Sequence, residues 1–516
     1  MKNQKLLDSA LKFHREGNID QADDIYKAIL KSDKKNFDAN HLHGLVLSQK
    51  KKHKEALGFL KEAFNQNSNN YELTNNLGIV YKNLQDYNNA QKLYLLAIKI
   101  DKNNYKAYFN YGNLCIDFKK YDQAIDFLKK SISYNDNFAT AYQRLSEVYQ
   151  LKYKIERDKE LLIKSQEYSK KTIEINPLYY DAYVLLALSY LWMGKIKEAN
   201  DVFKKHYSLF ILDNNNLNNI IKKYLSDSYN LGLLIKHEYE QLTYIDNDLD
   251  GIRNMKFSKE YYEFLKKNYS SVINNSFNME KIEYKNKIQL LQQLYNKPPK
   301  SFSNNLLNLN NDIKSIEHEY VNSNPEIVVI DNLLTPEALL SLQKFCNSAN
   351  IFKRPYPNGY VGAFLSHGMS NEFLLKLSED LRLTYKEIMK DYKLIQSWIF
   401  KHDTNQKGVI THADVAKVNV NLWISRQESN LSPKTGGLQI WKKIPPDDWS
   451  FGDYNYDINS KKMEELLKKD KAEKIQVPYK ENRAVIFNSK LFHKTDRFDF
   501  KDNFTDRRLN LTFLYD

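Results

Sequence analysis

The chain has 516 residues, of which 42% are hydrophobic and 27% charged, so it is long enough for about two to four domains and is not a disordered protein. The net charge of +13 is spread over interleaved basic and acidic residues, with 11 arginines among 77 basic residues, and this pattern disfavours nucleic acid as a partner. No apolar run reaches membrane-spanning length, the first residues carry no secretory signal, and two cysteines exclude a disulfide framework, so we expect a cytoplasmic protein with no membrane partner.

The first 209 residues repeat with a period of 34. Windows 37–70, 71–104 and 105–138 share the same small residue at their eighth position, and these are Gly44, Gly78 and Gly112. Small residues also recur at positions 20 and 27, whereas positions 11 and 24 are apolar and mostly large. Small residues let two antiparallel helices approach closely, and the larger ones fill the space between helix pairs.

This pattern resembles the tetratricopeptide-repeat (TPR) family. Further windows near 3–36, after 138 and at 180–213 bring the array to about six repeats. The resemblance implies an all-α superhelix over 1–209 whose concave groove binds a protein or peptide, although the array could also be only a structural arm. The residues expected to line the groove have mixed chemistry and do not identify the ligand: Asn75, Phe109, Asn113, Gln143 and Glu147.

Residues 210–325 lose the repeat but keep apolar helical patterns, and we interpret them as a helical cap and connector. The stretch 297–311, which contains two prolines and several asparagines, is typical of a linker.

From about residue 326 the hydrophobic pattern changes. A β-branched run at 326–331 precedes predicted helices at 334–348 and 371–392. Strand-like runs follow at 394–401, 415–425, 437–442, 484–488 and 509–515. Many short strands after two helices predict a β-sandwich or barrel with helical support over residues 326–516.

His412 and Asp414 stand at the edge of the second strand-like run. Residues two apart in a strand share a face, so this imidazole and this carboxylate can hold one metal ion. The pair alone is weak evidence, because such a pair is expected by chance. A third ligand is available at His493, which follows the run 484–488. Two histidines and one carboxylate with open positions form the facial triad of non-haem Fe(II) oxygenases.

Arg508 begins the last strand-like run. Alternation places Arg508, Asn510 and Thr512 on one face, where an arginine and a hydroxyl can hold a carboxylate. The order His-x-Asp, distal His, then Arg resembles the Fe(II)/2-oxoglutarate-dependent dioxygenases, with the prolyl 4-hydroxylase-like and phytanoyl-CoA-dioxygenase-like branches as the nearest. The resemblance covers the C-terminal domain.

The resemblance implies a double-stranded β-helix (jelly-roll) with supporting helices. It implies that His412, Asp414 and His493 are the catalytic metal ligands for Fe(II), that 2-oxoglutarate and O2 are co-substrates, and that the enzyme hydroxylates a substrate. Arg508 would bind the distal carboxylate of 2-oxoglutarate, assisted by Thr512.

Two departures from the family pattern leave alternatives open. The spacing from His493 to the arginine is longer than usual, so Arg507 competes with Arg508 for the co-substrate; we prefer Arg508 because it shares a face with polar residues. Where the family often has a tyrosine that bonds the co-substrate, this chain has His402. His402 either donates the same bond or is a solvated turn residue.

Other residues near the predicted site have weaker interpretations. Residues 447–474 form an insertion with a charged helix, either a lid or a solvated excursion. His367 and Trp449 lie in predicted loops that could face the pocket. Four large aromatic residues are assigned to the core rather than to a substrate platform: Tyr356, Trp398, Trp423 and Trp441.

Three functions are compared on this basis. The main hypothesis is a dioxygenase whose repeats recruit a protein or peptide substrate. The alternative is a TPR scaffold with a catalytically inactive oxygenase-like domain. A sugar or nucleotide transferase would need a glycine-rich phosphate loop, and the sequence contains no GxGxxG motif.

Overall fold

The computed structural model of the chain describes residues 2–248, 258–292, 299, 305–403, 406, 408–455 and 459–516. Most of the predicted linker at 297–311 lies outside these residues. The chain forms two compact units, Met1–Leu185 and Leu186–Asp516. Residues 186–325 therefore group with the C-terminal unit, whereas the domain boundaries predicted from the sequence lie at residues 209 and 325. Of the helices that the structure describes, none is both long and apolar enough to cross a bilayer.

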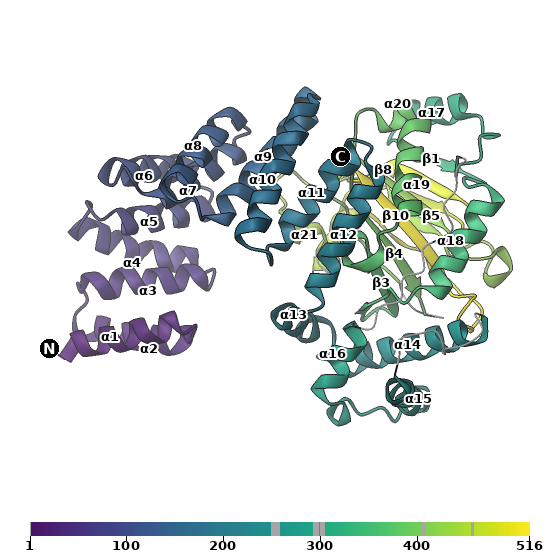
Figure 1. Cartoon of the computed structure of the whole chain (residues 1–516), viewed down its shortest axis with the longest axis horizontal. Helices are drawn as coiled ribbons and strands as arrows, with labels where there is room; N and C mark the ends of the chain where they lie inside the picture. Colours follow the sequence, from purple (N-terminus) through teal and green to yellow (C-terminus); the bar gives the residue numbers. More distant parts are fainter. Residues whose placement is uncertain are drawn as a thin grey trace. The chain divides into compact units, whose positions relative to one another are not determined.

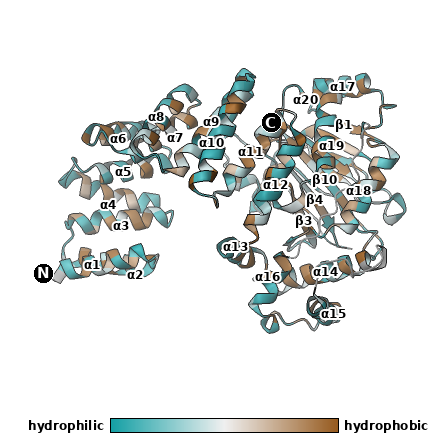
Figure 2. Cartoon of the chain, in the orientation of Figure 1, coloured by the Kyte–Doolittle hydropathy of each residue, from teal (hydrophilic) through white to brown (hydrophobic). Residues whose placement is uncertain are grey.

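The N-terminal unit is a series of antiparallel helix pairs, as the pattern of small and large residues predicts (Figure 1). The helices are α1 (Lys2–Arg15), α2 (Ile19–Ser32), α3 (Phe37–Gln49), α4 (His53–Gln66), α5 (Tyr71–Asn83), α6 (Tyr87–Ile100), α7 (Tyr105–Asp117), α8 (Tyr121–Tyr134), α9 (Ala139–Glu156), α10 (Lys159–Ile175) and the start of α11 (Tyr180–Trp192). Along these helices hydrophobic residues alternate with hydrophilic ones, as expected when one face of each helix is buried (Figure 2).

The repeat period is visible in the way the helices begin and in how closely they pack. Asn36, Asn70 and Asn104 stand 34 residues apart, and each side chain accepts a hydrogen bond from the first turn of the following helix. A Cβ atom on Gly44 would lie 2.6 Å from Cγ of Leu60 in the paired helix, so only glycine fits this approach. The same contact joins Gly78 to Tyr94 and Gly112 to Leu128, and it confirms the predicted role of position 8. The residue at position 24 makes this contact within a helix pair, whereas it was predicted to fill the space between pairs.

The C-terminal unit contains two antiparallel β-sheets. The larger sheet has the order β1-β8-β5-β10-β4-β3-β2, and the smaller has the order β7-β6-β9. The strands are β1 (Ile327–Ile330), β2 (Arg354–Tyr356), β3 (Tyr360–Phe364), β4 (Leu394–His402), β5 (Val418–Trp423), β6 (Leu438–Trp441), β7 (Lys474–Val477), β8 (Ala484–Asn488), β9 (His493–Thr495) and β10 (Leu509–Tyr515). Trp423 and Phe487 of the larger sheet share one hydrophobic core with Leu438 and Ile440 of the smaller. The predicted jelly-roll topology stays a prediction.

Helices surround the larger sheet (Figure 1). They are α12 (Ile196–Phe210), α13 (Asn214–Tyr224), α14 (Ser228–Asp248), α15 (Lys259–Ile273), α16 (Tyr284–Gln292), α17 (Ile313–Asn322), α18 (Pro336–Ser348), α19 (Glu372–Thr384), α20 (Lys386–Met389), α21 (Phe451–Asn455) and α22 (Ser460–Lys469). Thr335 caps α18 and Pro336 begins it, as the sequence predicts. The predicted helix 371–392 instead divides at Tyr385 into α19 and α20.

Candidate metal centre

The three predicted metal ligands meet at one point of the C-terminal unit. His412 precedes β5 and His493 begins β9, and their backbones form a two-way bridge with N–H to O distances of 3.0 and 2.9 Å. The ligand atoms of His412, Asp414 and His493 all lie within 4.8 Å of one another. His412 and Asp414 precede β5 rather than standing in it, so the predicted strand alternation does not apply to them. The backbone bridge places His412 beside His493, and the N–H of Asp414 donates to the carbonyl of Ser489 at 3.0 Å.

The distances between the ligand atoms suit a bound cation. Nε2 of His493 lies 3.5 Å from Oδ2 of Asp414, and Nε2 of His412 lies 3.9 Å from Oδ1 of the same carboxylate. Metal bonds to nitrogen and oxygen are about 2.0 to 2.2 Å long, so an ion between these atoms is reached by small side-chain rotations. Three protein ligands leave further coordination positions for water or a co-substrate.

Hydrogen bonds orient both imidazoles toward the carboxylate. Nδ1 of His412 lies 2.8 Å from the carbonyl of Ile410, and Nδ1 of His493 lies 2.9 Å from the carbonyl of Leu491. A carbonyl only accepts, so each Nδ1 carries the proton and each Nε2 keeps its lone pair. This is the arrangement that metal-binding histidines use.

The electrostatics of the centre call for a positive charge. Burial raises the pKa of Asp414, opposed by the charge of His412 and by a hydrogen bond from Asn419 Nδ2 at 3.0 Å. Burial also lowers the pKa of His493 well below its ordinary value, and the neighbouring His412 lowers it further. The neutral form of His493 is the form that binds metal.

A polar pocket includes both histidines in its lining. Arg508, directly before β10, lines it together with Asn510 and Thr512 of β10 and with Asn419 and Asn421 of β5. This confirms the predicted alternation along the last strand. The hydroxyl of Thr512 accepts a hydrogen bond from Asn421 Nδ2 at 3.1 Å.

Arg508 is a buried cation with neutral partners. Its side chain is 1% exposed and donates to the carbonyls of Gly436 (2.7 Å) and Gly437 (3.4 Å) and to Asn510 Oδ1 (3.0 Å). Among the described residues, no carboxylate forms an ion pair with Arg508. Burial therefore lowers the pKa of this guanidinium to about 10.

Arg507 points away from the pocket. Its guanidinium pairs with Glu240 at 2.5 Å and with Asp403 at 3.2 Å, both outside the pocket lining. Of the two adjacent arginines, Arg508 is therefore the one that a ligand in the pocket can reach.

His402 is neither solvated nor part of the pocket lining. It ends β4, is 1% exposed, and shares Asn510 Oδ1 with Arg508 through its Nε2 at 3.2 Å. The interpretation as a solvated turn residue was wrong, because β10 and Phe498 bury the ring. Burial keeps its pKa well below the ordinary value, so His402 is a neutral support for Asn510.

An aromatic cleft includes His412 and Asp414 in its lining. One wall carries the rings of β2, β3 and β4 with one from α13, and these are Tyr356, Tyr360, Phe364, Trp398, Phe400 and Tyr224. Phe451 and Asn455 of α21 also line it. Tyr356 and Trp398 thus line a cleft and are not purely core residues, whereas Trp423 is fully buried, as expected. The sequence held no signal for this, since aromatic residues in strands are most often core.

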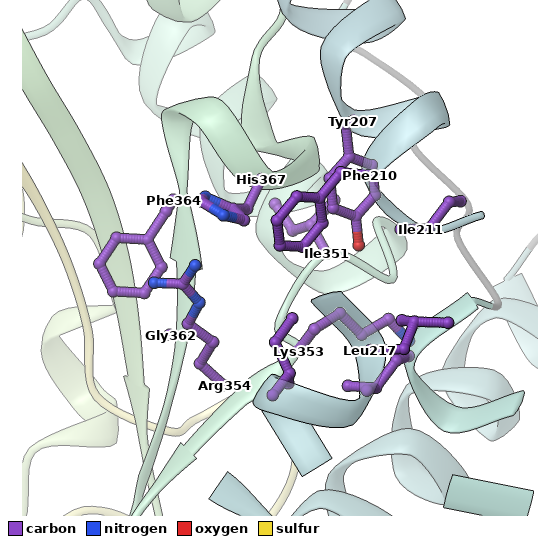
Figure 3. Close-up of a pocket in the computed structure, with 12 residues that line it drawn as sticks. Tyr207, Phe210, Ile211, Leu217, Ile351, Lys353, Arg354, Gly362, Phe364 and His367 are labelled. Atoms are coloured by element: carbon purple, nitrogen blue, oxygen red, sulfur yellow. The ribbon is translucent and has the colours of Figure 1, made fainter. Parts of the chain in front are cut away.

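His367 and Trp449 do not line the metal pocket. His367 lies in a separate apolar pocket with Tyr207, Phe210 and Phe364, beside the side chain of Arg354 (Figure 3). Trp449 packs edge-on against Phe492.

Comparison with known proteins identifies the N-terminal array. Models of the tetratricopeptide repeat match residues 71–104 and 93–126. The N-terminal region contains tetratricopeptide repeats. No curated protein matches the chain.

Solved structures similar to the chain include several repeat proteins. MamA is 28% identical over 32% of this chain and 85% of its own, with a TM-score of 0.28. PilF of Pseudomonas aeruginosa is 16% identical over 43% of this chain and 97% of its own, with a TM-score of 0.36. YrrB, a TPR protein with an unusual peptide-binding site, is 16% identical over 36% of this chain and 91% of its own, with a TM-score of 0.29.

Proposed function

We propose that the C-terminal unit is an Fe(II)/2-oxoglutarate-dependent dioxygenase and that its two sheets are the halves of a double-stranded β-helix. The observation that carries this proposal is one pocket lined by His412, His493 and Arg508, where Asp414 lies with the two histidines in a group whose ligand atoms are within 4.8 Å of one another. Two imidazole nitrogens and a carboxylate suit Fe(II), and a buried arginine suits the far carboxylate of a small dicarboxylic acid.

When bound, Fe(II) with 2-oxoglutarate and O2 supplies an oxidation that hydroxylates a C–H bond and releases succinate and CO2. The residues of the chain contribute binding, orientation and exclusion of water. Arg508 holds the distal carboxylate, and Asn510, itself supported by His402, fixes the guanidinium. The aromatic wall of the cleft holds an apolar part of the substrate within reach of the metal ligands.

The TPR array supplies a partner-binding surface in this proposal. Polar side chains of successive repeats are hydrogen-bonded to one another: His41 to Asn76, Asn75 to Asn110, and Arg144 to Asn113. Two of these residues, Asn75 and Asn113, were predicted to line the concave groove, and such a ladder offers donors and acceptors to a peptide backbone. We infer that the array recruits a protein or peptide, which is then the substrate or delivers it. A cytoplasmic location stays a prediction.

The proposal is tested by succinate formation from 2-oxoglutarate with Fe(II) and O2. Wild-type protein is compared with His412→Ala, Arg508→Lys and the control His318→Ala, which removes an exposed histidine of the same unit. The first two variants are expected to lose succinate formation and the control to keep it. Equal rates in all four proteins would reject the site.

A TPR scaffold with an inactive oxygenase-like domain is the second candidate. It is favoured by the family matches, which lie within the repeats. This candidate predicts that wild-type protein forms no succinate in the assay with O2, whichever captured partner is present. The result should be the same when the metal has first been loaded under anaerobic conditions.

A further inference from the structure

The insertion at 447–474 is attached directly to the turn that carries two of the metal ligands. Ala413 stands between His412 and Asp414, and both of its backbone polar groups bond to α21. Its N–H donates to the carbonyl of Tyr454 at 3.1 Å, and its carbonyl accepts from Asn455 Nδ2 at 2.7 Å. The peptide units on either side of Ala413 are therefore held by the insertion.

Apolar packing reinforces this attachment. Met463 and Leu467 of α22 form one buried cluster with Ala413 and Phe492. Phe492 directly precedes His493, so the same helix covers the neighbours of all three ligands. The burial of Met463 and Leu467 contradicts the interpretation of the insertion as a solvated excursion, whereas the interpretation as a lid stays a prediction.

Asn455 also faces the aromatic cleft, as Phe451 of the same helix does. Its side chain lines the aromatic cleft, close to His412 and Asp414 in the same lining. A substrate in the cleft therefore lies against the residue that bonds the ligand turn.

We propose that Asn455 is a positioning residue that sets the distance between the His412 and Asp414 side chains by fixing the carbonyl of Ala413. This inference rests on the proposed metal centre. The turn that carries His412 and Asp414 lies outside β5, and the amide of Asn455 takes the place of water as the donor to the carbonyl of Ala413. Without this donor, the side chains of His412 and Asp414 lose their common orientation. Substituting a residue that orients a metal ligand by a hydrogen bond, without binding the metal itself, commonly lowers metal affinity by about 10- to 100-fold.

The test uses Co(II), whose visible absorption reports coordination number and geometry. Full-length wild type, Asn455→Ala, Asn455→Asp and Asn455→Gln are titrated, with Asn459→Ala as the matched control. Asn459 donates to the carbonyl of Gly452 at 2.7 Å, inside the same insertion but away from Ala413. Circular dichroism of the metal-free proteins verifies that each variant is folded.

Asn455→Ala and Asn455→Asp are expected to bind Co(II) at least about tenfold more weakly, with an altered absorption spectrum. Asn455→Gln, which keeps the donor, is expected to bind more tightly than Asn455→Ala, and Asn459→Ala to match wild type in affinity and spectrum. If Asn455→Ala shows wild-type affinity and spectrum, only the proposed role of Asn455 is overturned, and the metal centre is not. A wild-type protein that binds no Co(II) would overturn the metal centre and this inference with it.

Discussion

Arg508 allows a quantitative prediction about the co-substrate. The guanidinium is buried without an anionic partner, and burial lowers its pKa from the ordinary arginine value to about 10. That difference corresponds to about 3 kcal/mol by which burial disfavours the charged form. A ligand carboxylate that pairs with Arg508 recovers part of this cost, and a hydrogen bond to a charged group contributes about 1.5 to 3 kcal/mol. The distal carboxylate should therefore raise affinity by about 10- to 100-fold.

The assay compares 2-oxoglutarate with pyruvate, which has the same 2-oxo acid end but no distal carboxylate. Calorimetric titration of Mn(II)-loaded protein without O2 gives both affinities. We expect 2-oxoglutarate to bind about 10- to 100-fold more tightly to wild type and the two acids to bind about equally to Arg508→Met. Arg497→Met, at an exposed arginine, is the control and should keep the wild-type ratio. An unchanged ratio in Arg508→Met would refute the assignment of Arg508 to the distal carboxylate.

Two further predictions concern stability. Gly44→Ala places a Cβ 2.6 Å from the facing Leu60, and the overpacking cost of about 1 to 3 kcal/mol should exceed the gain of about 1 kcal/mol in helix propensity. At Gly112 the corresponding distance is 3.0 Å, so the overpacking cost and the propensity gain of Gly112→Ala should nearly cancel. Urea unfolding of the full chain checks this, and a Gly44→Ala protein more stable than wild type would contradict the packing. Asp331 accepts from Arg483 Nε at 2.5 Å and Nη2 at 3.0 Å, and these bonds lower its pKa. Because the folded pKa lies below the unfolded one, Asp331→Asn should cost about 1 kcal/mol at pH 7. The cost should begin to shrink as the pH falls through about 4 and should vanish only below the folded pKa; a cost that does not change as the pH falls from 7 to well below 4 would argue against the ion pair.

Much of the fold follows from hydrophobic patterning, and the exceptions have local causes. The runs at 326–331, 394–401 and 484–488 coincide with strands because they are rich in β-branched and aromatic residues. Four strands were missed: β2, β3, β7 and β9. β2 and β9 have three residues each, and β2 contains one proline and precedes another. Such strands are defined by their partners in the sheet rather than by their own sequence.

The candidate metal ligands and Arg508 could be proposed from the sequence because His, Asp and Arg are chemically distinctive and occur in a recognisable order. Asn419 and Asn455 were missed, since asparagine is abundant throughout this chain and a supporting hydrogen bond leaves no pattern in sequence. The choice of Arg508 over Arg507 could be made from strand alternation. The partner of Arg507 could not be predicted, because Glu240 lies in α14, far away in the sequence.

Anaerobic Fe(II) titration of the purified chain tests most directly whether His412, Asp414 and His493 bind one ferrous ion. We expect one ion per chain in wild type and in His318→Ala, and loss of binding in Asp414→Ala and His493→Ala. Iron binding that survives both ligand substitutions, or a folded wild-type protein that takes up no iron, would contradict it.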